Sequence, residues 1–127
     1  MASDAVTYDE GNIFARILRG EIPCDKVFED EHVLAFHDVN PQTAVHILVI
    51  PKGAYVSMDD FTGKASDAEI TALMRAVGRI AAENGLTEAG YRILVNNGEH
   101  ANQEVPHLHI HILAGQPLGR MIKPLHK

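Results

Sequence analysis

Tryptophan is missing from this 127-residue sequence, and aromatic residues make up only 6% of it, so any core must be mainly aliphatic. The single cysteine, Cys24, excludes an intramolecular disulfide, and an oxidising compartment is therefore not indicated. No apolar run approaches the ~20 residues that a membrane helix needs. Residues 1–11 have neither the basic start nor the apolar run of a signal peptide. We therefore expect a cytoplasmic protein that does not enter membranes.

Basic residues are too few for a nucleic-acid-binding surface, because the formal net charge is −6. The charge is also uneven along the chain. All 17 carboxylates lie at or before Glu104, whereas residues 105–127 hold four histidines, two lysines and one arginine. A small anionic ligand would be repelled least by this last segment.

The length fits one domain, with residues 1–11 as a flexible N-terminal tail and residues 12–127 as the domain. Asn12 is placed to cap a short helix over residues 13–19. Strand patterns cover residues 26–29, 32–37 and 46–50, and residues 53–64 form a predicted loop.

A capping box, Ser66 to Glu69, predicts the start of a long helix. Its apolar positions form one stripe: Ile70, Leu73, Met74, Val77, Ile80 and Ala81. Two more strand patterns follow, at 91–96 and 107–113. Because the central strands are joined by links too short for parallel crossovers, we predict an α+β fold. It has a mainly antiparallel five-stranded sheet, a short N-terminal helix and one long helix.

Histidines alternate with aliphatic residues in the last predicted strand. Since successive side chains of a strand point to opposite faces, His107, His109 and His111 share one face. Leu108, Ile110 and Ile112 share the other, which belongs to the core. Histidine is a poor packing residue, because both ring nitrogens need partners when buried.

Two functions fit three imidazoles on one face. They could help bind zinc, with further ligands from His46 or Glu104. Alternatively, a neutral imidazole could act as a nucleophile on phosphorus, while its neighbours orient it and stabilise charge. The alternation alone favours neither.

Residues 107–113 resemble the signature of the histidine triad (HIT) family, His-apolar-His-apolar-His followed by two apolar residues. Further collinear segments are similar to the family at residues 12–23, 34–41, 46–52, 90–96 and 102–106. The resemblance covers about residues 12–118 and is nearest to the Hint-type branch of purine nucleoside phosphoramidases. It implies a HIT-like fold.

The resemblance also implies a reaction. His109 would attack the α-phosphorus of a nucleotide conjugate, giving a nucleotidyl-histidine intermediate that water hydrolyses to AMP or GMP. His111 would stabilise charge on the phosphoryl oxygens, His107 would position the nucleophile, and His46 would complete the cluster. Nucleotide contacts would come from Asp38 at the ribose, from Asn96, Gln103, Glu104 and Val105 near the phosphate, and from a base slot of Ile13, Phe14, Ile17, Phe36 and Val39.

The sequence departs from the Hint-type pattern at Glu104, where many members carry serine. This carboxylate could repel an anionic substrate, donate a proton to a leaving amine, or point to solvent. The cysteine pair of zinc-containing relatives is replaced by Asn12 and Ala15, so we predict no metal and no cofactor.

The resemblance implies a homodimer that takes a purine nucleotide substrate. Three other functions are alternatives. The Hint-like opening helix disfavours dinucleoside polyphosphate hydrolysis, and the missing cysteine pair disfavours metal binding. Nucleotide binding or scaffolding with little turnover stays open.

Overall fold

The computed structural model describes residues 7–122. The helices and strands follow one another as α1 (Ile13–Leu18), β1 (Lys26–Glu29), β2 (Val33–His37), β3 (Val45–Pro51), α2 (Met58–Lys64), α3 (Asp67–Glu83), β4 (Arg92–Leu94), the short 3-10 helix η1 (Glu99–Ala101) and β5 (Ile110–Ala114). The predicted tail and domain extend beyond the described residues at 1–6 and 123–127. None of the helices within residues 7–122 is long and apolar enough to cross a membrane.

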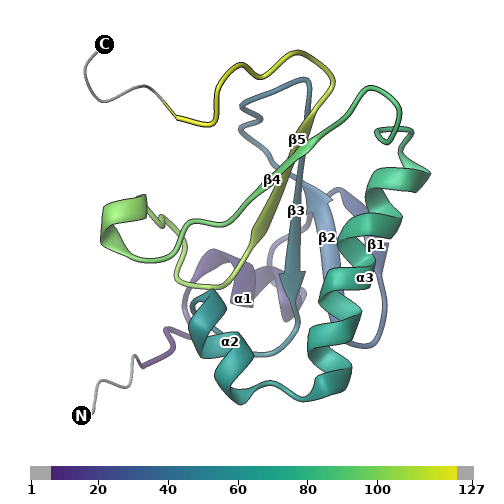
Figure 1. The fold of residues 1–127 in the computed structure, drawn as a ribbon. Helices are drawn as coiled ribbons and strands as arrows, with labels where there is room; N and C mark the ends of the chain where they lie inside the picture. Colours follow the sequence, from purple (N-terminus) through teal and green to yellow (C-terminus); the bar gives the residue numbers. More distant parts are fainter. Residues whose placement is uncertain (1–6, 123–127) are drawn as a thin grey trace.

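The five strands form one sheet in the order β1-β2-β3-β5-β4, and every neighbouring pair is antiparallel. This confirms the predicted α+β class with a five-stranded antiparallel sheet. The long helix α3 lies along one face of the sheet, whereas α1 lies at the opposite face (Figure 1). Successive side chains of β3 and β5 therefore point alternately toward α3 and toward the face that bears α1.

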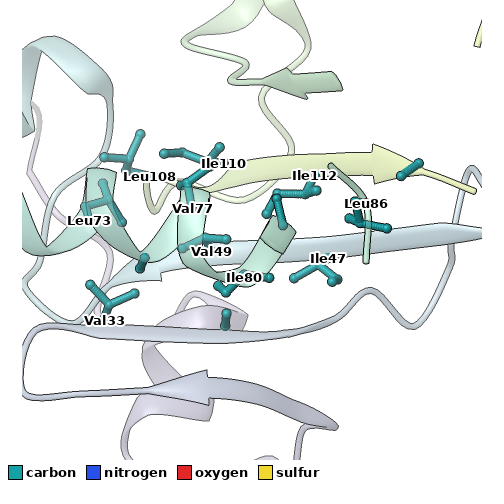
Figure 2. Packing of buried hydrophobic residues seen from close by; sticks show 14 of the residues in the cluster. Val33, Ile47, Val49, Leu73, Val77, Ile80, Leu86, Leu108, Ile110 and Ile112 are labelled. Atoms are coloured by element: carbon teal, nitrogen blue, oxygen red, sulfur yellow. The ribbon is translucent and has the colours of Figure 1, made fainter. Parts of the chain in front are cut away.

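The larger core lies between α3 and the sheet. Ile47 and Val49 of β3 and Ile110 and Ile112 of β5 pack against the apolar side of α3 (Figure 2). On the other face, Phe14 of α1 packs against a smaller cluster: Leu34, Phe36, Leu48 and Ile50. Because successive residues of β3 contribute to different clusters, the odd-numbered ones face α3 and the even-numbered ones face α1.

The predicted capping box is present at the start of α3, where Ser66 accepts from the Glu69 backbone N–H and Glu69 accepts from the Ser66 backbone N–H. The buried side of α3 differs from the predicted stripe at two places. Ala76 is buried, and Met74 is 47% exposed although it was expected to face the core. Met74 lies at the border of the stripe, where helical spacing alone does not determine which side chains the sheet covers.

The prediction of a loop over residues 53–64 is wrong, because α2 occupies its second half. Ser57 caps this helix by accepting from the Asp60 N–H, and Asp59 and Asp60 lie favourably in its first turn. Only Phe61 of α2 is buried, so the segment carries no apolar stripe. Thr62 and Gly63 further weaken its helical pattern.

The last strand begins at Ile110 instead of residue 107. Pro106 has no backbone N–H, and the next two donors bond outside the sheet. The His107 N–H bonds the Val105 carbonyl, and the Leu108 N–H bonds the Tyr55 carbonyl. Alternation nevertheless continues through these residues, since Leu108 belongs to the core beneath α3 while His107 and His109 contact Phe14.

The fourth strand is also shorter than the predicted 91–96. It pairs with β5 from Arg92, opposite Leu113, to Leu94, opposite His111. Pairing stops there because β5 itself begins only one residue before His111.

Candidate active site

His109 lies immediately before β5, buried to 6% exposure. Its Nδ1 atom is 2.7 Å from the backbone carbonyl oxygen of His107. A carbonyl oxygen can only accept, so Nδ1 carries the ring proton and Nε2 keeps its lone pair. Burial lowers the pKa of His109, against the opposing effects of this carbonyl and of Asp38. The residue is thus held near neutral pH as an uncharged imidazole with a free Nε2 lone pair.

His46 and His111 form a second pair that extends from β3 to β5. The Gln42 backbone N–H donates to Nδ1 of His46 at 3.0 Å, so Nε2 of His46 must carry the proton. That Nε2 lies 2.9 Å from Nδ1 of His111 and donates to it. His111 therefore carries its own proton on Nε2. This Nε2 is buried and has no hydrogen-bond partner among the described residues.

The unpartnered Nε2–H of His111 lies beside His109, because the His109 and His111 ring centroids are 4.9 Å apart. Burial, followed by the neighbouring His109 and His46, lowers the pKa of His111 to about 4. Burial also lowers the pKa of His46. An unpartnered buried donor costs free energy unless a ligand satisfies it. The lone pair on Nε2 of His109 and the unpartnered N–H of His111 therefore belong to neighbouring rings. Attack on a phosphoryl group uses a nucleophile and a hydrogen-bond donor of this kind.

His107 supports the site from behind and has no exposed surface. Its Nε2 donates to the Pro51 carbonyl at 2.9 Å, and its Nδ1 is 2.5 Å from the Tyr8 hydroxyl. Burial lowers the pKa of His107 to about 4. Because both ring nitrogens are bonded, His107 is no free ligand for a metal or a phosphate.

A zinc ion shared by the three histidines of the triad does not fit this arrangement. Within residues 7–122, the candidate cluster of ligand atoms is instead Asp38, His46 and His111, whose atoms lie within 4.8 Å of one another. A metal on Nε2 of His46 would move its proton to Nδ1, which would then face the Gln42 N–H, donor against donor. The hydrogen bonds therefore disfavour a metal here, and the expectation of none stays a prediction.

An apolar cleft of about 250 Å³ lies between α1 and the end of β2. All five residues predicted for the base slot line it: Ile13, Phe14, Ile17, Phe36 and Val39. Phe14 and Phe36 form an edge-to-face pair with centroids 5.6 Å apart, and Val39 is 87% exposed at the rim. The cleft is also lined by four residues that were not predicted to belong to it: Ile22, Pro23, Cys24 and Leu48.

A polar cleft of about 340 Å³ adjoins the apolar one. It brings together the predicted Asn96 and His46 with three amides that were not predicted, Asn40, Gln42 and Asn102. The two clefts share five residues: Asp38, Asn40, Glu104, His109 and His111. His109 therefore lies where the two clefts meet. A ligand with an apolar end in one cleft and a polar end in the other would have its middle part next to His109.

Asp38 directly follows β2, and its carboxylate is 3.5 Å from Nε2 of His46. Its own backbone N–H bonds the His46 carbonyl, which fixes the two residues together. The exposed Glu104 lines both clefts, with Asn102 at 3.5 Å as its neighbour. No lysine or arginine of residues 7–122 lines either cleft.

Of two further residues that were predicted to contact the nucleotide, Val105 and Gln103, only Val105 lines a cleft. Val105 lines the apolar cleft. Gln103 lines neither cleft, because its amide is used by backbone groups. It accepts from the Gly98 N–H and donates to the Val56 and Val105 carbonyls. Gln103 thus fixes the loop that carries Val105 and does not line the candidate site.

Known proteins of similar sequence and structure identify the family of the chain. Residues 19–118 match the profile of the HIT domain. The chain belongs to the HIT family. The family match begins after α1, so Tyr8 lies outside it.

Individual HIT proteins match over most of their length. A HIT-like protein of Azospirillum brasilense is 69% identical over 93% of this chain and 97% of its own. The purine nucleoside phosphoramidase of Escherichia coli is 40% identical over 89% and 94%. The solved structure of a histidine triad protein from Clostridium difficile matches with a TM-score of 0.78 and 42% identity, over 90% and 98%.

Proposed function

We propose that this HIT protein hydrolyses nucleotide conjugates, in particular purine nucleoside phosphoramidates, at the α-phosphorus. The observation that carries the proposal is the pairing of a neutral His109, whose Nε2 lone pair is free, with the unpartnered Nε2–H of His111. The name of the Escherichia coli relative supports the same substrate class.

The reaction runs in two steps. Nε2 of His109 attacks phosphorus, the Nε2–P bond forms, and the P–N bond to the leaving amine breaks. Water then cleaves the nucleotidyl-histidine. Over both steps one water is consumed, so the nucleoside monophosphate takes the hydroxyl and the amine takes the hydrogen. The His111 Nε2–H binds a phosphoryl oxygen as its charge develops.

The two clefts suit the two ends of such a substrate. The base lies in the apolar cleft against Phe14 and Phe36, and Asp38 at the junction binds the ribose hydroxyls. Asn96 and the backbone near Val105 contact the phosphate, and the leaving group extends into the polar cleft.

The charge of the polar cleft supports an amine leaving group over a polyphosphate. A polyphosphate carries several negative charges, and enzymes stabilise these with lysine, arginine or a metal. Among the described residues that line the two clefts, the charged side chains are the carboxylates Asp38 and Glu104. A leaving amine meets no repulsion from them.

The test is incubation with an adenosine 5′-phosphoramidate and, separately, with diadenosine tetraphosphate, both with and without chelator. We expect AMP release from the phosphoramidate that resists chelator, that exceeds release from the polyphosphate, and that His109→Ala abolishes. AMP binding without any release would support a binding or scaffolding role instead. Faster cleavage of the polyphosphate would overturn the proposed leaving group.

A further inference from the structure

The segment just before α1 is fixed by a compact set of hydrogen bonds. The Asp9 carboxylate accepts from the Gly11 N–H, and the Asp9 carbonyl accepts from both the backbone and the side chain of Asn12. Asn12 in turn caps α1 by accepting from the Ala15 N–H. Arg19 at the other end of α1 donates to the Glu10 carbonyl. Tyr8 is therefore held in place by α1.

Tyr8 covers the ring of His107. The two rings meet edge to face at 71°, with centroids 5.6 Å apart, and the hydroxyl oxygen lies 2.5 Å from Nδ1 of His107. Since Nε2 of His107 donates to the Pro51 carbonyl, Nδ1 of the neutral ring can only accept. The Tyr8 hydroxyl is the donor, and burial raises its pKa, which keeps that proton in place.

His107 is connected to the nucleophile through its main chain. Its carbonyl oxygen is the acceptor that holds the Nδ1–H of His109 at 2.7 Å. Phe14 packs edge-on against both rings, at 6.3 Å from His107 and 5.0 Å from His109. A change in the position of residue 107 therefore moves the group that selects the His109 tautomer.

We propose that Tyr8 is a positioning residue of this active site, which holds His107 neutral and fixed so that the His107 carbonyl orients His109. The effect on rate rests on the proposed hydrolysis, whereas the link between Tyr8 and His107 does not. Tyr8 acts by satisfying Nδ1 of a buried ring and by closing that ring off from water.

The groups that face His107 determine what removal of the Tyr8 hydroxyl does. His109 on the same segment disfavours a second positive charge, whereas the Pro51 carbonyl at the end of β3 favours protonation, and Phe14 from α1 is uncharged. A donor on Nδ1 stabilises the neutral ring. Without it, we expect the pKa of His107 to rise above about 4, although burial, the main cause of the low pKa, remains.

The experiment compares Tyr8→Phe with Tyr91→Phe, the same change on a partly exposed tyrosine before β4. Nitrogen-15 NMR of the histidine rings across a pH titration reports the tautomer and pKa of His107 in each protein. In Tyr8→Phe we expect the His107 pKa to rise and its Nδ1 signal to shift, with both unchanged in Tyr91→Phe. With the phosphoramidate substrate, we expect kcat to fall roughly fivefold to tenfold, the loss of about one hydrogen bond, while KM stays within about twofold.

Tyr8→Ala separates donation from packing, because it also uncovers the ring. It should raise the His107 pKa further than Tyr8→Phe does. Unchanged ring signals and an unchanged His107 pKa in a folded Tyr8→Phe protein would overturn the proposal. A wild-type protein without turnover would overturn the proposed hydrolysis alone, since the NMR comparison would still decide the role of Tyr8.

Discussion

The Nε2 atom of His46 lies 2.9 Å from the Nδ1 atom of His111, although the two residues are not opposite each other in the sheet. In the register of β3 and β5, His46 pairs with Leu113 and His111 pairs with Leu48. The two imidazoles therefore meet diagonally on the face that bears α1. This contact, together with the Gln42 N–H, assigns the proton of each ring and leaves the Nε2–H of His111 without a partner among the described residues.

Replacing His46 should slow catalysis by freeing the His111 tautomer. In His46→Ala, nothing donates to Nδ1 of His111, and its proton can occupy either nitrogen. We expect kcat to fall about tenfold to hundredfold, as for other groups that orient a site, with a smaller change in KM. In His46→Gln, the side-chain amide can donate from the same place, so much of the rate should return. Equal rates in the two variants would contradict the proposed role of His46 in fixing the position of the His111 proton.

The four clustered imidazoles, three of them buried and His111 partly buried, predict that the protein loses stability on acidification. Burial lowers the pKa of His46, His107, His109 and His111 below the ordinary 6.5. Below pH 6.5 the unfolded chain thus binds more protons than the folded one, so the free energy of unfolding falls as pH decreases toward about 4. It is highest, with respect to these groups, above pH 6.5. His107 alone accounts for a loss of roughly 3 kcal/mol.

Urea unfolding between about pH 7 and pH 4 measures this dependence. His107→Gln is the matched variant. It will be less stable at neutral pH, but its free energy of unfolding should vary less with pH. A wild-type profile that stays flat across this range would show that the four imidazoles do not remain neutral.

Asp38 should distinguish ribose from sugars without hydroxyl groups. Its Oδ1 accepts from the Asn40 N–H at 2.8 Å, a bond that the amide oxygen of an Asp38→Asn variant could keep. The charged acceptor for the ribose hydroxyls would be lost, and KM for an adenosine substrate should rise about tenfold. A 2′,3′-dideoxyadenosine substrate should bind both proteins almost equally. A similar rise in KM for both substrates would count against ribose recognition.

The free edge of the sheet supports the proposal that the protein forms a homodimer. Strand β4 pairs only with β5 among the described strands, Ile93 on it is 50% exposed, and Tyr91 just before it is 41% exposed. An open edge with apolar side chains favours pairing with a second copy. We expect light scattering to give a dimer mass at micromolar concentration and Ile93→Lys to lower it, whereas Glu31→Lys in the β1–β2 turn should not. A monomeric wild-type protein would refute the dimer.

Local patterns in the sequence predict the sheet correctly, and most of the candidate site residues predicted from the sequence lie close together in the structure. The alternation of residues 107–112 places the aliphatic side chains under α3 and the imidazoles opposite, even where regular pairing has not begun. The family resemblance places Asp38, Asn96 and the base-slot residues around His109. Strand alternation depends on residues that are neighbours in the chain, and the family resemblance depends on short motifs. Both can be read directly from a sequence.

Contacts between distant residues were not predictable in the same way. Tyr8 lies 99 residues from His107, within a segment that composition identifies only as a flexible tail. Gln103 belongs to a recognisable motif, but its partners Val56 and Gly98 depend on how two loops pack. The short α2 has one buried residue and therefore no periodic signal. The predicted flexible tail over residues 1–11 and the cytoplasmic location stay predictions, although hydrogen bonds hold Asp9 and Gly11 of that segment next to α1.

The covalent role of His109 is tested most directly by rapid mixing with the phosphoramidate, followed by an alkaline quench and peptide mass spectrometry. We predict a transient adenylyl group on the peptide that contains His109, formed before AMP appears and missing in His109→Ala. An identical time course with chelator would accompany it. AMP released at full rate by an enzyme that never carries the adenylyl group, or that carries it on another residue, would contradict the account.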